Sequence, residues 1–335
     1  MEQEWSYDDD ELIEMAELFK VFGNSTRILD LMDSASEGRS KTETLITRFS
    51  QKYTPCVVIA ALVLAVVPPL FTGFNFAPWI HRALNFLVVS CPCALVISVP
   101  LAFFGGMGGV SKAGMIAKGG VALENLAKVD TVVFHKTGTL TTGDFQVVRV
   151  DSDLPDLVEL VAAAEALSSL KKLGISEMCM LTGDRETAAK RAAEGLGMDS
   201  FRHSLLPQDK LNEVEQMQQH GRRVAFVGDG VNDAPVLTLA YVGVAMGGVG
   251  SDAAVEASDL VLLKDDLRGL PGAIRIARRT IANAKQSIVF ALAVKFGVMA
   301  LSIPGIANMW LAVFADVGVA ILCILNSFRA MKAKD

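Results

Sequence analysis

The sequence predicts a mixed fold, in which an α-helical transmembrane bundle of four spans is joined to a cytoplasmic, doubly wound α/β domain. Hydrophobic residues make up 51% of the 335 residues and charged residues 20%, a balance too apolar for an ordinary soluble protein. Four stretches stay apolar over the roughly 20 residues that a helix needs to cross a bilayer. Between the second and third stretches, short β-branched runs alternate with helical segments, which indicates an α/β sheet domain.

The four apolar stretches, at about 54–73, 84–104, 287–303 and 309–328, are expected to be membrane spans. Basic residues gather just before the first stretch and just after the last, at Arg39, Lys41, Arg48, Lys52, Arg329, Lys332 and Lys334. By the positive-inside rule, both termini and the α/β domain then face the cytoplasm. We therefore expect an integral protein of the plasma (inner) membrane whose first partner is the lipid bilayer. The net charge of −6 offers no basic surface for nucleic acid.

The α/β region contains β-branched runs that each lead into a polar turn. These runs are VDTVVF, MCML, RRVAFV, YVGVAM and DLVLL. In doubly wound sheets, ligands bind beyond the carboxyl ends of the strands. The polar residues that follow these runs are therefore the candidates for a functional site.

Two cysteines flank a proline in the second apolar stretch, in the motif Ser90-Cys91-Pro92-Cys93. Proline removes a backbone hydrogen bond and frees carbonyl groups beside the thiols. Thiolates suit soft or borderline cations such as Cu⁺, Zn²⁺ and Cd²⁺, so Cys91 and Cys93 are candidate ligands for a soft divalent metal ion. The alternative interpretation is a kinked helix with two ordinary buried cysteines.

The third and fourth apolar stretches each contain a charged residue, Lys295 and Asp316 respectively. A charge in a span costs about 2.5–3.5 kcal/mol on insertion scales, so it usually serves a site or a partner. We predict that Asp316 joins Cys91 and Cys93 as a metal ligand. Lys295 is then a built-in cation that balances the ligand charge. The alternative is a structural Lys–Asp pair with no metal nearby.

A third set of polar residues is suited to a phosphate and its metal ion. Asp229, Asn232 and Asp233 follow a strand with the oxygen ligands that Mg²⁺ prefers. Thr182, Gly183 and Asp184 offer a hydroxyl and backbone N–H groups at a strand-to-helix turn. Lys210, in LLPQDK, adds a point charge for a phosphoryl oxygen.

Together these residues resemble the heavy-metal P-type ATPases of the haloacid-dehalogenase-like superfamily, over about 28–333. The motifs that carry the resemblance are CPC, GMIAKGGVALENLAKVDTVVF, KTGTLTTG, LTGDRETA, LLPQDK and VAFVGDGVNDAPVL. Lys295 and the ADVG around Asp316 are similar to the Zn²⁺/Cd²⁺/Pb²⁺ branch. The resemblance implies that ATP phosphorylates an aspartate with the help of Mg²⁺ and that Zn²⁺ or Cd²⁺ is exported. It also implies catalytic roles for the position of His135 and for Lys136, Thr137, Thr182, Gly183, Asp184 and Lys210.

The chain departs from the family pattern at the nucleophile. His135 stands where the family has the phosphorylated aspartate, in His135-Lys136-Thr137. An imidazole cannot form an acyl phosphate, and its presence removes a carboxylate from the Mg²⁺ shell. We expect an inactive ATPase, and the alternative at this position is a phosphohistidine.

Two further departures concern whole domains. Only about forty residues separate Thr141 from Thr182, whereas a stable domain needs more than about 50. The family inserts its nucleotide domain here, so we expect ATP to lack an adenine pocket. About fifty residues precede the first span, and we expect the actuator domain to be missing as well.

The predicted organisation has five parts. Residues 1–27 form an amphipathic leader that resembles the opening helix of ArsR-type repressors, and 28–53 form a remnant helix that leaves the actuator. A transmembrane pair with the CPC motif covers 54–110. A haloacid-dehalogenase-like phosphorylation domain covers 111–282, with a remnant of the nucleotide domain at 143–178. Residues 283–335 form the last transmembrane pair and a tail.

The favoured hypothesis is a transport-incompetent member of the family that still binds metal. One alternative is a working Zn²⁺/Cd²⁺-exporting ATPase. Another is a regulatory partner of an intact homologous pump. A remnant phosphatase of the same superfamily is the last alternative, although its chemistry needs the carboxylate that His135 replaces.

Overall fold

The computed structural model describes residues 41–71, 73–90, 93–136, 139–140, 155–248, 251–264 and 266–330, with the side chains of 41–51, 93, 155–162 and 330 left aside. The predicted leader at 1–27 and residues 28–40 of the predicted remnant helix lie outside these residues. The chain divides into two compact units, one built on Val110–Arg275 and the other on Arg39–Gly109 with Ile276–Asp335. Each unit is described by itself.

The second unit is made of long apolar helices. They are α3 (Lys41–Phe71), α4 (Phe76–Ser90), α5 (Cys93–Lys112), α12 (Gly269–Ser302), α13 (Met309–Val313) and α14 (Val319–Ser327), with a π-helical turn, η2 (Phe314–Gly318), between the last two. A short 3₁₀ turn, η3 (Phe328–Ala330), follows α14. Within the residues that the structure describes, four segments are long and apolar enough to cross a membrane: Lys52–Phe71, Phe76–Lys112, Gly269–Ser302 and Met309–Ser327. The prediction of four spans is confirmed.

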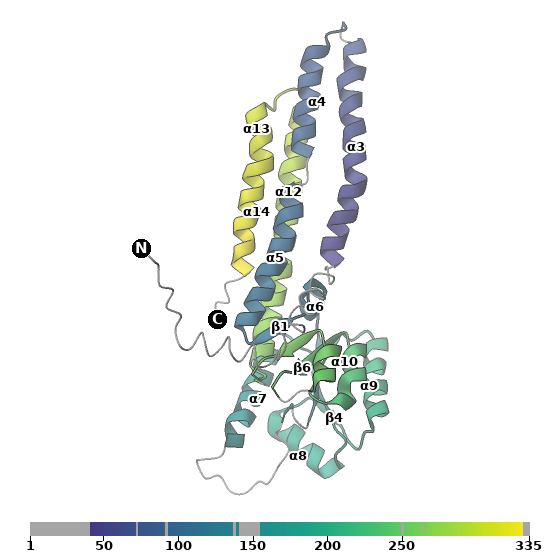
Figure 1. Cartoon of the computed structure of the whole chain (residues 1–335), viewed down its shortest axis with the longest axis vertical. Coiled ribbons are helices and arrows are strands. Elements are labelled where there is room, and N and C mark those ends of the chain that lie inside the picture. The colour runs from purple at the N-terminus through teal and green to yellow at the C-terminus, as the bar shows by residue number, and fades with distance from the viewer. Residues whose placement is uncertain are drawn as a thin grey trace, which may run out of the picture. The chain divides into compact units, whose positions relative to one another are not determined.

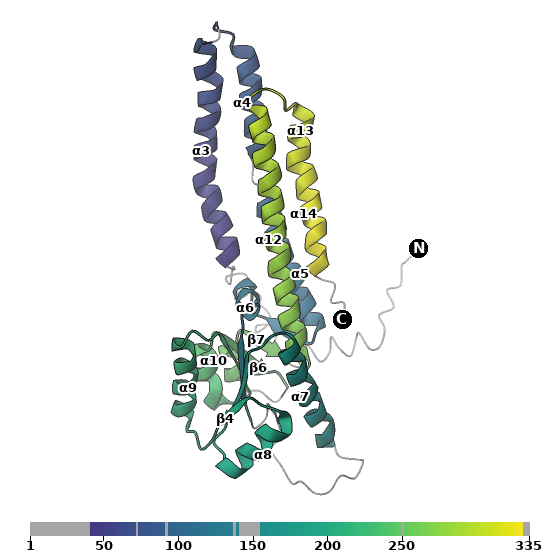
Figure 2. The same cartoon turned by 180° about the vertical axis from the view of Figure 1, so that it is seen from behind.

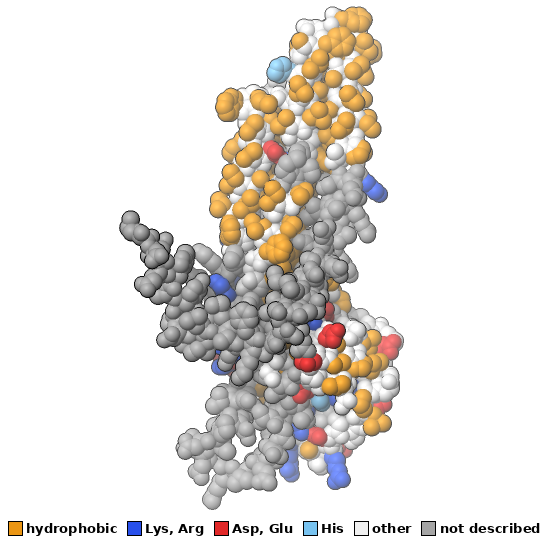
Figure 3. Space-filling view, viewed as in Figure 1, with side chains coloured by type: hydrophobic (Ala, Val, Ile, Leu, Met, Phe, Trp, Pro, Cys, Tyr) orange, Lys and Arg blue, Asp and Glu red, His pale blue; other side chains and the backbone are white. Residues whose placement is uncertain are grey.

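Hydrophobic side chains cover the outside of this helical unit (Figure 3). Val289 is 68% exposed and Trp310 84% exposed. Soluble proteins rarely expose contiguous apolar surface of this extent to water. Between the helices the contacts are made by small residues, such as Ala291 of α12 and Ala315 of η2, both fully buried. Small residues allow helix backbones to approach closely in lipid, so the packing agrees with a membrane environment.

The first unit is built on a seven-stranded sheet with the order β1-β7-β6-β5-β2-β3-β4. All neighbouring strands are parallel except the edge pair β1 and β7, which is antiparallel. The strands are β1 (Met115–Ala117), β2 (Thr131–His135), β3 (Glu177–Leu181), β4 (Ser200–Arg202), β5 (Val224–Gly228), β6 (Val242–Met246) and β7 (Leu260–Leu262). The predicted doubly wound α/β fold is confirmed.

Helices lie on the sheet because both of its faces are apolar. The helices are α6 (Gly120–Leu126), α7 (Pro155–Lys172), α8 (Glu186–Leu196), α9 (Pro207–Gln219), α10 (Ala234–Leu239) and α11 (Asp252–Ala257), with a 3₁₀ turn, η1 (Val231–Asp233), before α10. In both views, α9 and α10 lie side by side, and α7 contacts α8 (Figures 1 and 2).

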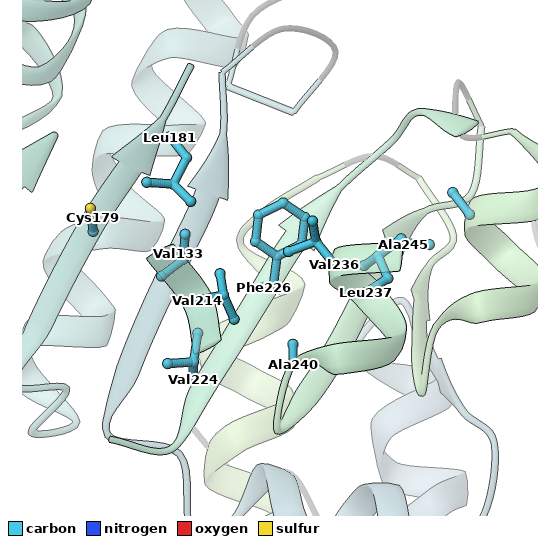
Figure 4. Packing of buried hydrophobic residues seen from close by; sticks show 11 residues of the cluster. Val133, Cys179, Leu181, Val214, Val224, Phe226, Val236, Leu237, Ala240 and Ala245 are labelled. Carbon is cyan, nitrogen blue, oxygen red and sulfur yellow. The ribbon is translucent and has the colours of Figure 1, made fainter. Parts of the chain in front are cut away.

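One core cluster joins alternate residues of the central strands to the helices on one face. Val133 of β2 and Phe226 of β5 belong to the same cluster as Leu237 of α10, and Phe226 lies beside Val236 of that helix (Figure 4). Successive residues of a strand point to opposite faces, and the intervening Phe134 and Val227 are also buried. Both faces are therefore covered, as expected for parallel strands.

The strand order reverses beside β2. From β2 the chain proceeds through β3 to β4 on one side, and β5, β6 and β7 follow on the other. Such a switch point leaves a crevice outside the carboxyl ends of the strands, where doubly wound proteins bind ligands. His135 ends β2 at this point, Thr182 follows β3, and Asp229 follows β5.

Candidate functional site

A pocket of about 350 Å³ opens at the switch point of the sheet. Residues at or after the ends of four neighbouring strands form it, so groups that are far apart in the sequence meet there. The lining residues are His135, Thr182, Gly183, Asp184, Leu205, Pro207, Lys210, Asp229, Gly230, Asn232 and Asp233. The structure thus gathers the polar residues of four separate sequence motifs in one place.

His135 lies between the two carboxylates of the pocket. Its Nδ1 is 3.2 Å from Oδ1 of Asp229, in a hydrogen bond, and 2.5 Å from Oδ2 of Asp233. Burial, the largest influence, lowers the pKa of His135, but the contacts with Asp229 and Asp233 outweigh it and raise the pKa above its usual value. The protonated imidazole is therefore favoured between these acids.

Asp233 is fully buried and holds a lysine on its other oxygen. Lys210 Nζ donates a hydrogen bond of 2.9 Å to Asp233 Oδ1. Burial acts to raise the pKa of Asp233, but His135 and Lys210 outweigh it and hold this pKa below its usual value. Gly228 leaves room for the Asp233 side chain, because a β-carbon at position 228 would stand 3.1 Å from Asp233 Oδ2. Two positive and two negative groups then balance in the pocket.

The turn after β3 forms the opposite wall. Thr182 is buried, and its Oγ1 accepts a hydrogen bond of 3.1 Å from the backbone N–H of Asp184. Lys136, which follows the imidazole in the chain, forms an ion pair with Asp184 across the pocket. A β-carbon at Gly183 would lie 3.3 Å from the carbonyl oxygen of Leu205. The absence of a side chain there keeps this wall close to the next loop.

Mg²⁺ is the ion expected in this pocket, at Asp229, Asn232 and Asp233. The two carboxylates offer suitable oxygens, and Asp233 Oδ2 is buried without a hydrogen-bond partner. The third ligand position, however, is taken by the imidazole of His135, which lies within reach of both acids. Mg²⁺ demands oxygen ligands in near-octahedral geometry. The residues present therefore do not fit Mg²⁺ well.

In the membrane unit the structure joins the two predicted charges. Lys295 Nζ, on α12, lies 2.9 Å from Oδ1 of Asp316 and donates a second hydrogen bond of 3.1 Å to the carbonyl oxygen of Val89. Asp316 sits in the π-helical turn η2. Such turns are rare and occur frequently at functional sites.

Two of the predicted site positions fall outside the described residues, and of a third the structure describes the backbone alone. Thr137 and Cys91 are not among the described residues, and Cys93 is described only as the first residue of α5. Of the three predicted metal ligands, Asp316 is therefore the one whose side chain the structure describes. The helix α4 does end at Ser90, directly before the motif.

Sequence reasoning missed several neighbours of these sites. Leu205 and Pro207 line the pocket, and the quoted motif LLPQDK was the signal that contained them. Met299 was missed entirely, although its sulfur accepts from Tyr53 Oη at 3.5 Å and from Ser90 Oγ at 3.6 Å. Nothing in the local sequence distinguishes this methionine from a lipid-facing one.

The fold and the pocket are those of a haloacid-dehalogenase-like domain. The family model of the haloacid dehalogenase-like hydrolases matches residues 152–240. A crystal structure of a zinc-transporting PIB-type ATPase in the E2.Pi state superposes with a TM-score of 0.74 and 31% identity, over 91% of this chain and 67% of that one.

Curated relatives agree with this likeness. The zinc-transporting ATPase of Synechocystis sp. is 37% identical over 415 residues. The cadmium, zinc and cobalt-transporting ATPase of Bacillus subtilis is 38% identical over 411 residues. The alignments take in 93% and 92% of this chain and 58% of each relative. The protein belongs to the heavy-metal (zinc and cadmium) P-type ATPases and is an integral membrane protein.

Proposed function

We propose that this protein binds a soft divalent cation between its membrane helices but is not phosphorylated by ATP. The observation that carries the proposal is His135, which ends β2 at the switch point and contacts both Asp229 and Asp233. The family needs a carboxylate there to form an acyl phosphate, and an imidazole cannot replace it in that chemistry. Without the phosphorylated intermediate, ATP hydrolysis is not coupled to transport.

The connection between β2 and β3 supports the same proposal. Among the described residues of this connection, α7 is the single helix, and β3 begins five residues after it ends. The Synechocystis alignment has 415 positions and takes in 93% of this chain's 335 residues, so about 100 positions have no residue here. A stable domain needs more than about 50 residues. We infer that the missing positions are those of a nucleotide-binding domain.

The cation site of the proposal lies in the membrane unit. Cys91, Cys93 and Asp316 supply two thiolates and a carboxylate, a soft set that suits Zn²⁺ or Cd²⁺. The buried Lys295 neutralises Asp316 at 2.9 Å until a cation arrives. The relatives named above transport zinc or cadmium, which is the cargo we propose for this site. We further propose that the α/β unit and both termini lie in the cytoplasm, which the basic residues that flank the spans support.

Phosphate labelling separates loss of the acceptor from loss of the nucleotide site. The detergent-solubilised full chain and its His135→Asp variant are incubated either with ATP labelled on the γ-phosphate or with labelled inorganic phosphate. We expect no acid-stable label on the unaltered chain from either donor. The His135→Asp variant is expected to gain label from inorganic phosphate only, because Lys210 and Thr182 still line the pocket. Acid-stable label on the unaltered chain from ATP contradicts the proposal.

Cation binding is tested independently by titrating the same chain with Cd²⁺. We expect one high-affinity Cd²⁺ site that is lost in Cys91→Ala. Cys179→Ala is the matched control, because this cysteine is buried in β3 of the α/β unit. Equal Cd²⁺ binding by all three proteins places the cation elsewhere and overturns the membrane site.

A further inference from the structure

Three potential metal ligands meet in the α/β pocket, outside the membrane unit. They are His135, Asp229 and Asp233, and one ligand atom from each lies within 4.8 Å of the others. The imidazole comes from the end of β2 and the two acids from the loop and turn after β5. These strands are hydrogen-bonded neighbours, so the rigid sheet holds the ligands at a common edge.

One ligand atom is buried beside the imidazole. Asp233 is 0% exposed, and its Oδ2 lies 2.5 Å from His135 Nδ1. Lys210 binds the opposite oxygen, Oδ1. Asp233 therefore keeps Oδ2 directed at the other two ligands and available to a cation.

The chemistry of the ligand set selects the cation. Carboxylates alone suit hard ions such as Mg²⁺, whereas imidazole suits Zn²⁺, Cu²⁺, Fe²⁺ and Ni²⁺. Zn²⁺ accepts both imidazole nitrogen and carboxylate oxygen at similar bond lengths, so one imidazole with two carboxylates suits it. The histidine thus changes which ion the pocket prefers.

We propose that His135, Asp229 and Asp233 form a binding site for a borderline divalent transition-metal ion of the Zn²⁺ class, in preference to Mg²⁺. This site is distinct from the membrane thiols and does not depend on them. The wall formed by Asp184 and Lys136 leaves a pocket of about 350 Å³, which is roomy enough for water to complete the coordination.

The test uses the full chain in detergent with Cys91→Ser and Cys93→Ser, so that the two thiols of the proposed membrane site cannot contribute. Zn²⁺ is titrated calorimetrically in a large excess of Mg²⁺. We expect one Zn²⁺ per chain, with affinity reduced at least about tenfold by His135→Ala. Removing the hydrogen-bond partner of a metal ligand already lowers metal affinity about tenfold or more, and removing the ligand itself should lower it at least as much. His203→Ala is the matched control, because this histidine also faces a carboxylate, Glu186, at 4.0 Å but lies outside the pocket.

The reverse substitution sharpens the test. His135→Asp gives the pocket a third carboxylate, and we expect Mg²⁺ then to displace Zn²⁺. The proposal is overturned if Zn²⁺ does not bind, if binding survives His135→Ala, or if His203→Ala weakens it equally. It is also overturned if Mg²⁺ displaces Zn²⁺ from the site that contains the histidine.

A measurement without any change in the pocket guards against misfolded variants. Cu²⁺ bound to the same Cys91→Ser, Cys93→Ser chain is examined by pulsed electron paramagnetic resonance, which detects an imidazole nitrogen bound to the metal. We expect one coordinated imidazole, retained in His203→Ala. A spectrum with oxygen ligands alone overturns the proposal. Because the thiols of Cys91 and Cys93 are absent throughout, this result is independent of cation binding at the proposed membrane site.

Discussion

Both units of the protein bury a Lys–Asp pair, and the two pairs have the same length. Lys210 lies 2.9 Å from Asp233 in the α/β unit, and Lys295 lies 2.9 Å from Asp316 in the membrane unit. Both lysines are almost fully buried, at 6% and 3% exposure. The pairs differ in which further groups contact the aspartate and in how exposed the aspartate side chain is.

In the α/β unit, His135 and Asp229 extend the pair into a group of four charges, and Asp233 is completely buried. In the membrane unit, the Asp316 side chain is 19% exposed and sits in a π-helical turn. A cation that reaches Asp233 meets Oδ2 while Lys210 stays on Oδ1, whereas a cation that reaches Asp316 competes with Lys295 for Oδ1. With the two cation sites proposed above, the same two residue types would serve as a fixed brace in one unit and as an exchangeable counter-ion in the other.

The largest expected effect comes from removing the brace. Lys210→Met should lower the free energy of unfolding by about 3–5 kcal/mol, because it leaves Asp233 buried without its lysine. The measurement is urea-induced unfolding followed by circular dichroism. Lys190→Met is the control, since its pair with Glu194 is exposed and 4.0 Å long, and such pairs contribute about 0–1 kcal/mol. Equal losses in the two variants would show that Lys210 is not a brace.

Substitutions in the Lys295–Asp316 pair should change the affinity of the chain for Cd²⁺. Lys295→Met removes the resident competitor, so Cd²⁺ affinity should rise about tenfold, equivalent to about 1.4 kcal/mol. Asp316→Asn should lower it by at least as much, because a ligand is lost. Calorimetric titration with Cd²⁺ measures both, and Ser302→Ala, a buried polar change on the same helix, is the control. Weaker binding in Lys295→Met would mean that the lysine positions Asp316 instead of competing with the ion.

The smallest expected effect is the pH dependence of the α/β network. The pKa of His135 is raised by Asp229 and Asp233 against burial and the repulsion of Lys210. Its contribution to stability is therefore complete below the unfolded pKa of about 6.5 and is lost as pH rises through the folded pKa. In EDTA, the melting temperature of the chain should exceed that of His135→Gln most at the acidic end, by about 2–4 °C, the shift that about 1 kcal/mol produces in a domain of this size.

The opposite trend would contradict the charge assignment. If the difference in melting temperature grew as the pH rose, a neutral imidazole and not an imidazolium would be the stabilising form of His135. The depressed pKa of Asp233 sets the lower limit of the window, because its contribution falls away only as pH drops through that lower pKa.

Most of the fold was predictable because its signals are local. The runs that predicted strands became β2, β3, β5, β6 and β7, and the four apolar stretches became candidate spans. The strands β1 and β4 were not predicted, because their three residues do not stand in a longer apolar run such as the DLVLL that marked β7, a strand of the same length. β1 also pairs antiparallel with β7, across more than 140 residues, a pairing that no local pattern encodes.

The sequence by itself determined which chemical groups are present and at which strand ends or helix positions they stand. Composition and periodicity act over a few residues, so they suffice for spans, strands and motifs. Tertiary structure alone decided that His135 meets Asp229 and Asp233 on one side of the sheet while Lys210 takes the remaining oxygen. Contacts between charges separated by some ninety residues depend on strand order and packing, because only folding brings such groups within the few ångströms over which they bind.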